Sequence, residues 1–117
     1  MSIKKEKSGK IDKPETNEIF IGNKPFMKYV IAALTQIKKE ENECTIIKAR
    51  GKFISRAVDV AEVTKKKIKE IDNLILKDKI EINTEGFKND EGKSISVSTI
   101  AITLTKWLFI HLLIYLF

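Results

Sequence analysis

The chain has 117 residues, enough to bury one hydrophobic core and too few for two comfortable domains. Its formal net charge at pH 7 is +6, and basic residues gather in the segment 38–69, which favours one basic face with nucleic acid as its partner, ahead of an acidic membrane surface. The single cysteine (Cys44) and single histidine (His111) argue against a disulfide framework, a zinc site and a Ser-His-Asp or Cys-His catalytic site. We therefore expect an intracellular binding protein with no catalytic residue, no metal and no cofactor.

The N-terminal segment 1–17 is rich in lysine, lacks apolar periodicity and contains Gly9 and Pro14, a composition typical of a disordered basic arm. It is either a plain solvated terminus or a tail that adds contacts to phosphates. Its lysines are not followed by an apolar run, so we do not expect a secretory signal. We place the folded domain at residues 18–106.

A short buried strand over 19–21 is predicted to open this domain and to end at Gly22. Pro25 suits the first position of a helix because the N–H that proline lacks is not needed there. Apolar residues then recur at helical spacing as far as Ile37. This pattern predicts a helix over roughly 25–38 with its apolar stripe on the core.

A second strand over 44–49 leads into a basic turn centred on Gly51, the residue type that best tolerates a sharp bend. A helix begins near Ser55, which the pattern places at the N-cap. A strand end, a glycine bend and a helix N-terminus suit the binding of a polyanion. Coulomb attraction would come from Lys48, Arg50 and Lys52. The alternative is an ordinary connection whose lysines keep it solvated.

The helix that follows carries four lysines near its C-terminal end, where they match the negative end of the helix dipole. We interpret Asp59 and Glu62 on its first turns as structural, because no base, metal ligand or nucleophile accompanies them. Its buried side is predicted to consist of Ala57, Val58, Ala61, Ile68 and Ile71. A connection over 72–78 is expected after it.

Two strands complete the domain. The stretch 79–85 alternates between apolar and polar residues, which predicts a strand with one solvent-exposed face. A polar turn over 88–93 leads to a strand over about 94–105, whose apolar residues change from odd to even positions midway. One strand cannot keep both sets in a single core, so we expect either a bulge or a hairpin whose tip leaves the body. Such an arm, with Lys88 and Lys93 near its tip, suits groove binding.

The C-terminal segment 107–117 is almost entirely apolar. It is too short for a bilayer span, which needs about 20 residues. It is either an artefactual or variant terminus, a segment that packs on the domain or on a partner, or, least favoured, a membrane contact.

The expected order of elements is βαβαββ, a single α+β domain of two layers. Three separated stretches resemble the Alba family of small basic DNA- and RNA-binding proteins: residues 21–30 (IGNKPFMKYV), 47–59 (IKARGKFISRAVD) and 97–102 (VSTIAI). The resemblance covers residues 18–106 and implies an Alba-like fold with a long hairpin between its last two strands. It also implies a homodimer, or a heterodimer with another Alba-like protein, whose basic face coats double-stranded DNA or RNA with little sequence preference.

The resemblance also assigns roles to single residues. Family members carry two lysines after the first glycine, in a loop that lies on phosphates. Here Asn23 takes the first place and Lys24 remains, so the lysine whose acetylation controls archaeal members is missing and Lys24 is the candidate acetylation site. Ser96 stands where many members carry an arginine, which implies weaker binding by the arm. The implied nucleic-acid-binding residues are Lys24, Lys48, Arg50, Gly51, Lys52, Arg56 and, on the hairpin, Lys93.

Two further functions stay open at this point. Eukaryotic relatives use the same fold in RNA-directed roles, so the alternative to chromatin packaging is a subunit of a ribonuclease P-like or mRNA-storage particle. The C-terminal segment alone suggests a membrane-associated interaction protein, although membrane contact is not expected. The expected location is the nucleus or cytoplasm in a eukaryote, and the cytoplasm with the nucleoid in an archaeon.

Overall fold

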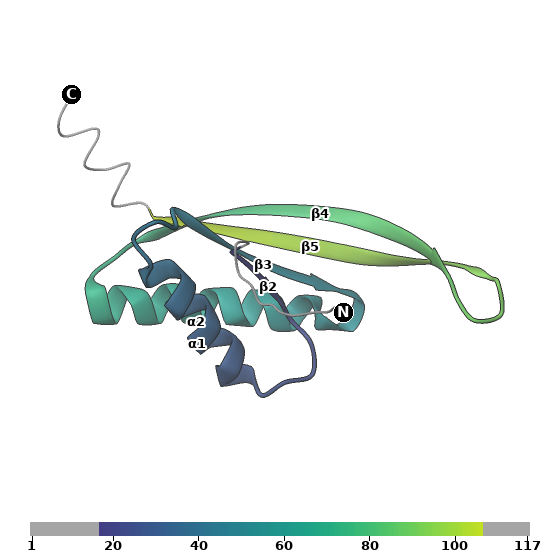
Figure 1. The fold of residues 1–117 in the computed structure, drawn as a ribbon, viewed down its shortest axis with the longest axis horizontal. Helices are drawn as coiled ribbons and strands as arrows, with labels where there is room; N and C mark the ends of the chain where they lie inside the picture. The colour runs from purple at the N-terminus through teal and green to yellow at the C-terminus, as the bar shows by residue number, and fades with distance from the viewer. Residues whose placement is uncertain (1–16, 107–117) are drawn as a thin grey trace, which may run out of the picture.

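The computed structural model describes residues 17–106, so the expected basic arm, apart from Asn17, and the expected apolar tail lie outside the described residues. The elements follow one another as β2 (Glu18–Phe20), α1 (Phe26–Lys38), β3 (Cys44–Arg50), the 3₁₀ turn η2 (Gly51–Phe53), α2 (Ile54–Asp72), β4 (Leu76–Lys88) and β5 (Ser94–Lys106). The predicted βαβαββ order and α+β class are confirmed (Figure 1). Within residues 17–106, neither helix is long and apolar enough to cross a bilayer.

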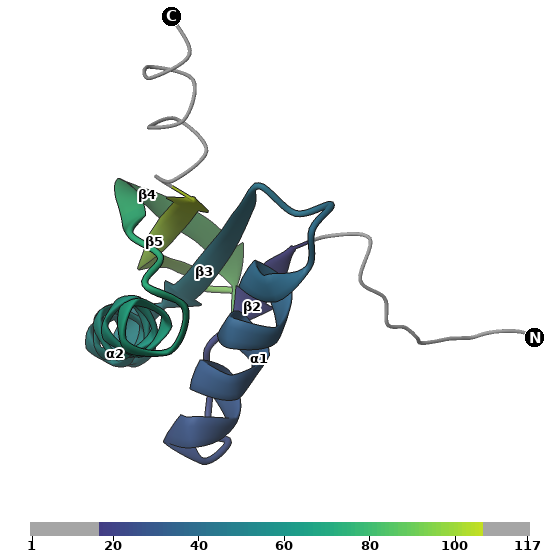
Figure 2. The ribbon, with the colours of Figure 1, turned by 90° about the vertical axis from the view of Figure 1, so that its left-hand side faces the viewer.

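The four strands form one sheet in the order β2-β3-β5-β4, with β2 parallel to β3 and the other neighbours antiparallel. Both helices pack on the same side of this sheet, and no helix of the described residues covers the other side (Figures 1 and 2). We call the covered side the helical face; it carries Ile19, Ile47 and Ile102. The uncovered side is the open face; it carries Phe20, Lys48 and Ala101.

The core lies between the helical face and the two helices. Alternate residues of β3 are buried there, as the period of two in a strand requires. Facing them are the apolar stripes of both helices, which confirms the helical periodicity seen in the sequence. The side chains that are almost fully buried include Val30 and Ile37 from α1, Val60 and Ile68 from α2, and Ile47, Ile102 and Leu104 from the strands.

The start of α2 differs from the prediction. The N-cap residue is Phe53 rather than Ser55, and among the described residues no side chain caps this end with a hydrogen bond. The cause is the turn before it. Gly51 has a φ of +59° and starts a 3₁₀ turn that leads directly into the helix, so Ser55 already lies inside the helix when the chain reaches it.

Two apolar residues of α2 that were expected in the core, Val58 and Ile71, are exposed. The buried stripe passes through Val60 and Thr64 instead. A helix of this composition offers apolar residues on more than one side, and the sequence pattern alone does not tell which of them meets the sheet. Val58 and Ile71 are therefore surface residues of the described chain.

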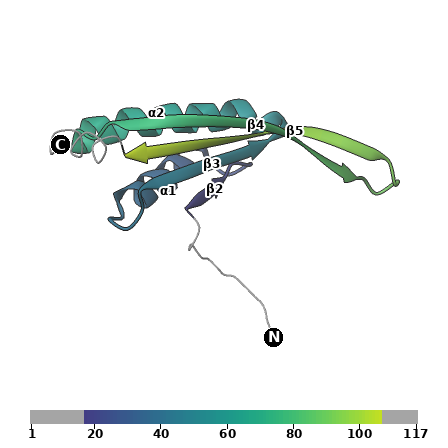
Figure 3. The same ribbon diagram turned by 90° about the horizontal axis from the view of Figure 1, so that it is seen from above.

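The hairpin of β4 and β5 extends beyond the rest of the sheet (Figures 1 and 3). The two strands pair residue for residue along their whole length, so the predicted bulge is wrong. β4 begins at Leu76, earlier than predicted, because Leu76 is buried at the end of the core. β3 ends at Arg50, opposite Thr99, and Ile95 and Val97 lie beyond that point. The change of apolar phase thus marks where the arm leaves the body, which confirms the second alternative.

Candidate functional site

The basic turn between β3 and α2 is held in shape by Gly51. Its positive φ lies in the left-handed region, which residues with a Cβ adopt only at a cost. A Cβ added here would meet nothing within 4 Å, so the backbone conformation, not crowding, calls for glycine. Arg50 at the end of β3 and Lys52 in η2 are both exposed. The turn is therefore a fixed bend with a cation on each side.

The neighbouring loop, residues 22–25, is fastened by two side chains. The Tyr29 hydroxyl accepts hydrogen bonds from the backbone N–H groups of Gly22 (2.9 Å) and Lys24 (3.0 Å). The Arg56 guanidinium donates to the carbonyl oxygens of Gly22 (3.0 Å) and Lys24 (2.8 Å) and lies 5.7 Å from the centre of the Tyr29 ring. The backbone of Lys24 is thus held while its side chain is exposed. Arg56 joins this loop to the first turns of α2.

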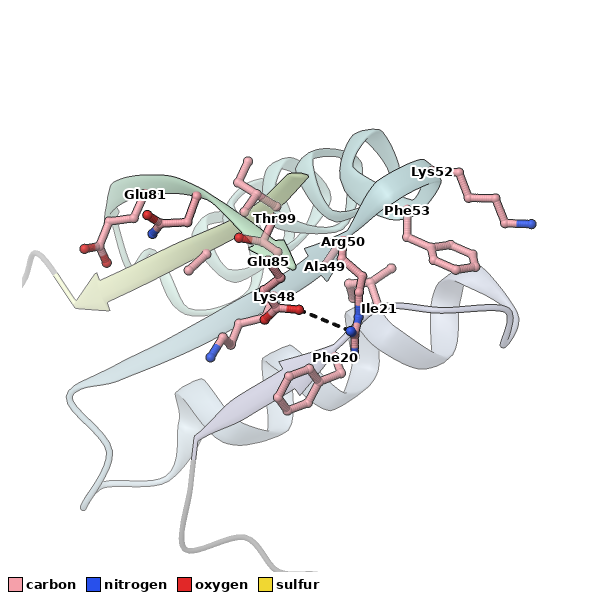
Figure 4. A pocket seen from close by; sticks show the side chains of 13 residues that line it. Phe20, Ile21, Lys48, Ala49, Arg50, Lys52, Phe53, Glu81, Glu85 and Thr99 are labelled. Carbon is pink, nitrogen blue, oxygen red and sulfur yellow. Dashed lines mark hydrogen bonds and ion pairs between the residues drawn. The ribbon is translucent and has the colours of Figure 1, made fainter. Parts of the chain in front are cut away.

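On the open face, cations of β3 form ion pairs with carboxylates of other strands, one on the neighbouring β2 and one on β4, across β5. Arg50 Nη1 lies 3.2 Å from Glu85 Oε1, and both side chains are more than half exposed (Figure 4). Lys48 Nζ lies 3.5 Å from Glu18 Oε2 and 5.5 Å from the centre of the Phe20 ring. Exposed ion pairs of this kind contribute about 0.2–1 kcal/mol. These ion pairs therefore contribute little to the stability of the domain.

All the expected binding residues except Lys93 lie on adjoining segments: loop 22–25, the end of β3, η2 and the first turns of α2. Lys93 lies near the tip of the hairpin, about 20 Å along the strand from Thr99, at the usual rise of a β-strand. The tip is ordered by Asn89, whose Oδ1 accepts hydrogen bonds from the N–H groups of Glu91 and Lys93, both at 2.9 Å. The site is thus one compact group of cations and one separate cation on the arm.

Sequence reasoning missed the open-face residues that surround these cations. Phe20 was expected in a buried strand, but its side chain is 65% exposed, because its neighbours in the chain occupy the core positions. The alternation of residues 79–85 places Asn83 and Glu85 on one face of their strand. Only the register shows what they meet: Asn83 pairs with Thr99, and Thr99 pairs with Arg50. These open-face residues can therefore be grouped only from the pairing of strands that are distant in the sequence, and the sequence pattern does not reveal that pairing.

A second polar cluster, away from the basic turn, fastens α2 to β4. Lys65 Nζ lies 2.6 Å from both Asp78 Oδ2 and Glu62 Oε2. These hydrogen bonds, the one to Asp78 first and the one to Glu62 second, raise the pKa of Lys65. Among residues 17–106, no group of three or more His, Cys, Asp or Glu side chains is placed to hold a metal ion.

A comparison with family models finds one match, described as Alba, over residues 17–84. This range runs from the residue before β2 to the middle of β4, and it includes the basic turn and the fastened loop. It therefore covers every expected binding residue except Lys93.

Curated relatives match over most of the chain. The DNA/RNA-binding protein Alba of Methanocella arvoryzae is 47% identical over 93 residues, which is 80% of this chain and 93% of the relative. The DNA/RNA-binding protein Alba of Methanococcus maripaludis is 47% identical over 96 residues, which is 77% of this chain and 98% of the relative.

Solved structures give the same fold. Alba from Thermoplasma volcanium matches with a TM-score of 0.63 at 45% identity, covering 75% of this chain and 98% of that one. ALBA1 from Trypanosoma brucei matches with a TM-score of 0.52 at 23% identity, covering 81% of this chain and 72% of that one. At that identity, the second likeness concerns the fold alone.

Proposed function

This chain belongs to the Alba family, and we propose that it binds double-stranded DNA and RNA by holding phosphates with its basic turn and the neighbouring loop. The observation that carries the proposal is the fixed bend at Gly51, which presents Arg50 and Lys52 to solvent beside the fastened backbone of Lys24. Because these cations stand on an ordered backbone, less conformational entropy is lost when a phosphate binds. Cations that reach phosphates carry no sequence information, so we expect little sequence preference.

The start of α2 supports an anion at the same place. The first turn of the helix contains no acidic residue, and no side chain of the described residues forms a capping hydrogen bond there. The Ile54 N–H donates to the Gly51 carbonyl oxygen, so the N–H groups that lack a helical partner belong to the 3₁₀ turn that precedes α2. The helix dipole is positive at this end. Both features favour a phosphate beside Lys52 and Arg56.

We further propose that the chain acts as a dimer, with a second copy or with another Alba-like chain. Ile80 and Ile82 lie on the helical face, opposite Ile102 and Ile100, but they are 59% and 75% exposed because they belong to the outermost strand. Ile82 and Ile54 of α2 line one hollow beside this strand, so apolar side chains continue the core layer at this edge. A two-fold axis at this edge would place the basic turns of both chains on one side of the dimer.

The dimer is tested with Ile82→Asp, whose carboxylate would be buried in the interface. We expect this variant to sediment as a monomer at concentrations where the wild-type chain is a dimer. The matched control is Ile31→Asp, at an exposed isoleucine on α1. If Ile82→Asp sediments like the wild type, the dimer does not use this edge.

The binding surface is tested with the double variant Arg50→Ala and Lys52→Ala. The matched control, Lys66→Ala with Lys69→Ala, removes the same charge from exposed positions of α2. We expect the first variant to bind duplex DNA and duplex RNA much more weakly at moderate salt and the control to bind nearly as the wild type does, with both variants folded by circular dichroism. Equal affinities of the first variant and the wild type would show that the turn is not the site.

The RNA-directed role is the second candidate, because the relatives are named as DNA/RNA-binding proteins. A side-by-side titration of duplex DNA and single-stranded RNA separates chromatin packaging from a role in a ribonuclease P-like or mRNA-storage particle. The archaeal relatives favour the archaeal alternative for location, cytoplasm with nucleoid. Acetylation of the exposed Lys24 ammonium would remove one cation from the surface and weaken binding.

A further inference from the structure

A groove crosses the open face beside the basic turn (Figure 4). Its volume is about 680 Å³, within the range of ligand pockets. The register explains its shape, since one row of residues across the four strands reads Phe20, Lys48, Ala101 and Glu81. The next row, across β3, β5 and β4, reads Arg50, Thr99 and Asn83. The small side chains of β5 in both rows leave a hollow between the larger side chains on either side.

Phe20 presents an aromatic ring to this groove instead of to the core. Its side chain is 65% exposed, whereas Ile19 and Ile21 on either side of it are buried. An exposed ring on a rigid sheet is a surface on which a base can stack. The Lys48 ammonium lies over one face of the ring, 5.5 Å from its centre, and is paired with Glu18 at 3.5 Å. A base would stack on the other face of the ring, and the phosphate of the same nucleotide would compete with Glu18 for the ammonium.

The groove is less suited to a phosphate alone. Glu81 and Glu85 line it, and Glu85 already holds Arg50 at 3.2 Å. A phosphate that entered the groove would be repelled by these two carboxylates. A base carries no charge and has a polar edge. Asn83 and Thr99, which face each other on β4 and β5, add an uncharged amide and hydroxyl to the side of the groove away from Phe20.

We infer that this groove binds an unpaired nucleotide, with its base on Phe20 and its phosphate on Lys48. A base inside a duplex is already stacked between its neighbours, so the groove selects single-stranded segments. The basic turn needs phosphates only and accepts duplexes. This inference rests on the proposed nucleic-acid binding. It implies two binding modes: the basic turn binds duplex backbones, and the groove binds unpaired bases.

The test compares Phe20→Leu with Phe87→Leu in the full chain. Both phenylalanines are exposed, and both belong to the open face, but Phe87 lies out on the hairpin opposite Ile95. We measure the affinity of each variant for a short single-stranded RNA and for a duplex of the same sequence. Phe20→Leu should lose about tenfold or more in single-strand affinity and keep its duplex affinity. Phe87→Leu should lose neither, and Phe20→Tyr, which keeps the ring, should bind like the wild type.

The outcomes separate this inference from the proposed function. If Phe20→Leu keeps its single-strand affinity, or loses single-strand and duplex affinity equally, the groove does not hold a base, while duplex binding by the turn stands. If Phe20→Leu and Phe87→Leu lose single-strand affinity to the same extent, the groove is likewise not the site that holds the base. If the wild-type chain binds neither nucleic acid in dilute buffer, the proposed function fails and the inference fails with it.

Discussion

The two faces of the sheet are built from alternate residues of the same strands, but they meet different surroundings. On the helical face, Ile47, Ile102 and Leu104 are packed under the helices and almost fully buried. On the open face, Lys48 and Arg50 meet carboxylates, an aromatic ring and solvent. The contrast teaches that one face supplies the stability of the domain and leaves the other free to carry binding groups. Substitutions on the two faces should therefore change different properties.

The largest effect is expected when neighbouring residues of β5 are truncated on opposite faces. Leu104→Ala removes a fully buried side chain and should lower the free energy of unfolding by about 2–5 kcal/mol, because a cavity remains in the core. Thr103→Ala, one residue away on the open face, should change it by no more than about 0.5 kcal/mol. Urea denaturation of both variants measures the difference. Similar losses would mean that the open face is also part of a packed core.

The sequence predicts the helical face well, because apolar periodicity is a local property of each element. The helix that contains Val30 and Ile37, the strand over 44–49 and the bend at Gly51 could all be recognised without coordinates. The N-cap of α2 could not be predicted in this way, because the 3₁₀ turn before the helix overrides the local preference for Ser55. The groove on the open face could not be predicted from the sequence either. Phe20 and Glu85 come together only through the pairing of strands that are far apart in the sequence.

The bend at Gly51, between β3 and α2, should show the next largest effect. Gly51→Ala should cost about 1–2 kcal/mol of unfolding free energy, because alanine is strained at the φ of this residue although there is room for its Cβ. Gly86→Ala, within β4 at an ordinary φ, should be neutral or slightly stabilising. Chemical denaturation compares the two, and equal costs would show that the conformation of Gly51 is not what requires glycine.

A gain in stability is expected where the core holds a polar atom without a partner. The hydroxyl of Thr64 is buried under α2 and has no hydrogen-bond partner among the described residues. Thr64→Val should therefore raise the free energy of unfolding by about 1 kcal/mol, seen as a higher melting temperature. Thr35→Val is the control, because the Thr35 hydroxyl is exposed and donates to the Ile31 carbonyl oxygen at 2.8 Å. A lower melting temperature for Thr64→Val would mean that its hydroxyl is satisfied after all.

The smallest effect concerns the polar cluster at the edge of the helical face. Lys65→Met should cost about 0.2–1 kcal/mol near neutral pH, since two partly exposed carboxylates lose their cation. Folding raises the pKa of Lys65, so its contribution is complete below the ordinary lysine pKa and is lost as the pH rises through the raised value. Denaturation of wild type and variant at neutral and strongly alkaline pH should show their difference vanishing at the alkaline end. A difference that persists there would point to packing of the lysine stem instead.

The salt dependence of duplex DNA binding tests the division between the two faces most directly. Each phosphate that a cation neutralises releases counterions, so the plot of log affinity against log salt has a slope of about −0.9 for each such contact. The chain with Arg50→Ala and Lys52→Ala should give a plot shallower by about 1.8 per chain, while its unfolding free energy falls by no more than about 1 kcal/mol through loss of the Arg50–Glu85 pair. An unchanged slope would contradict the assignment of phosphate binding to the turn.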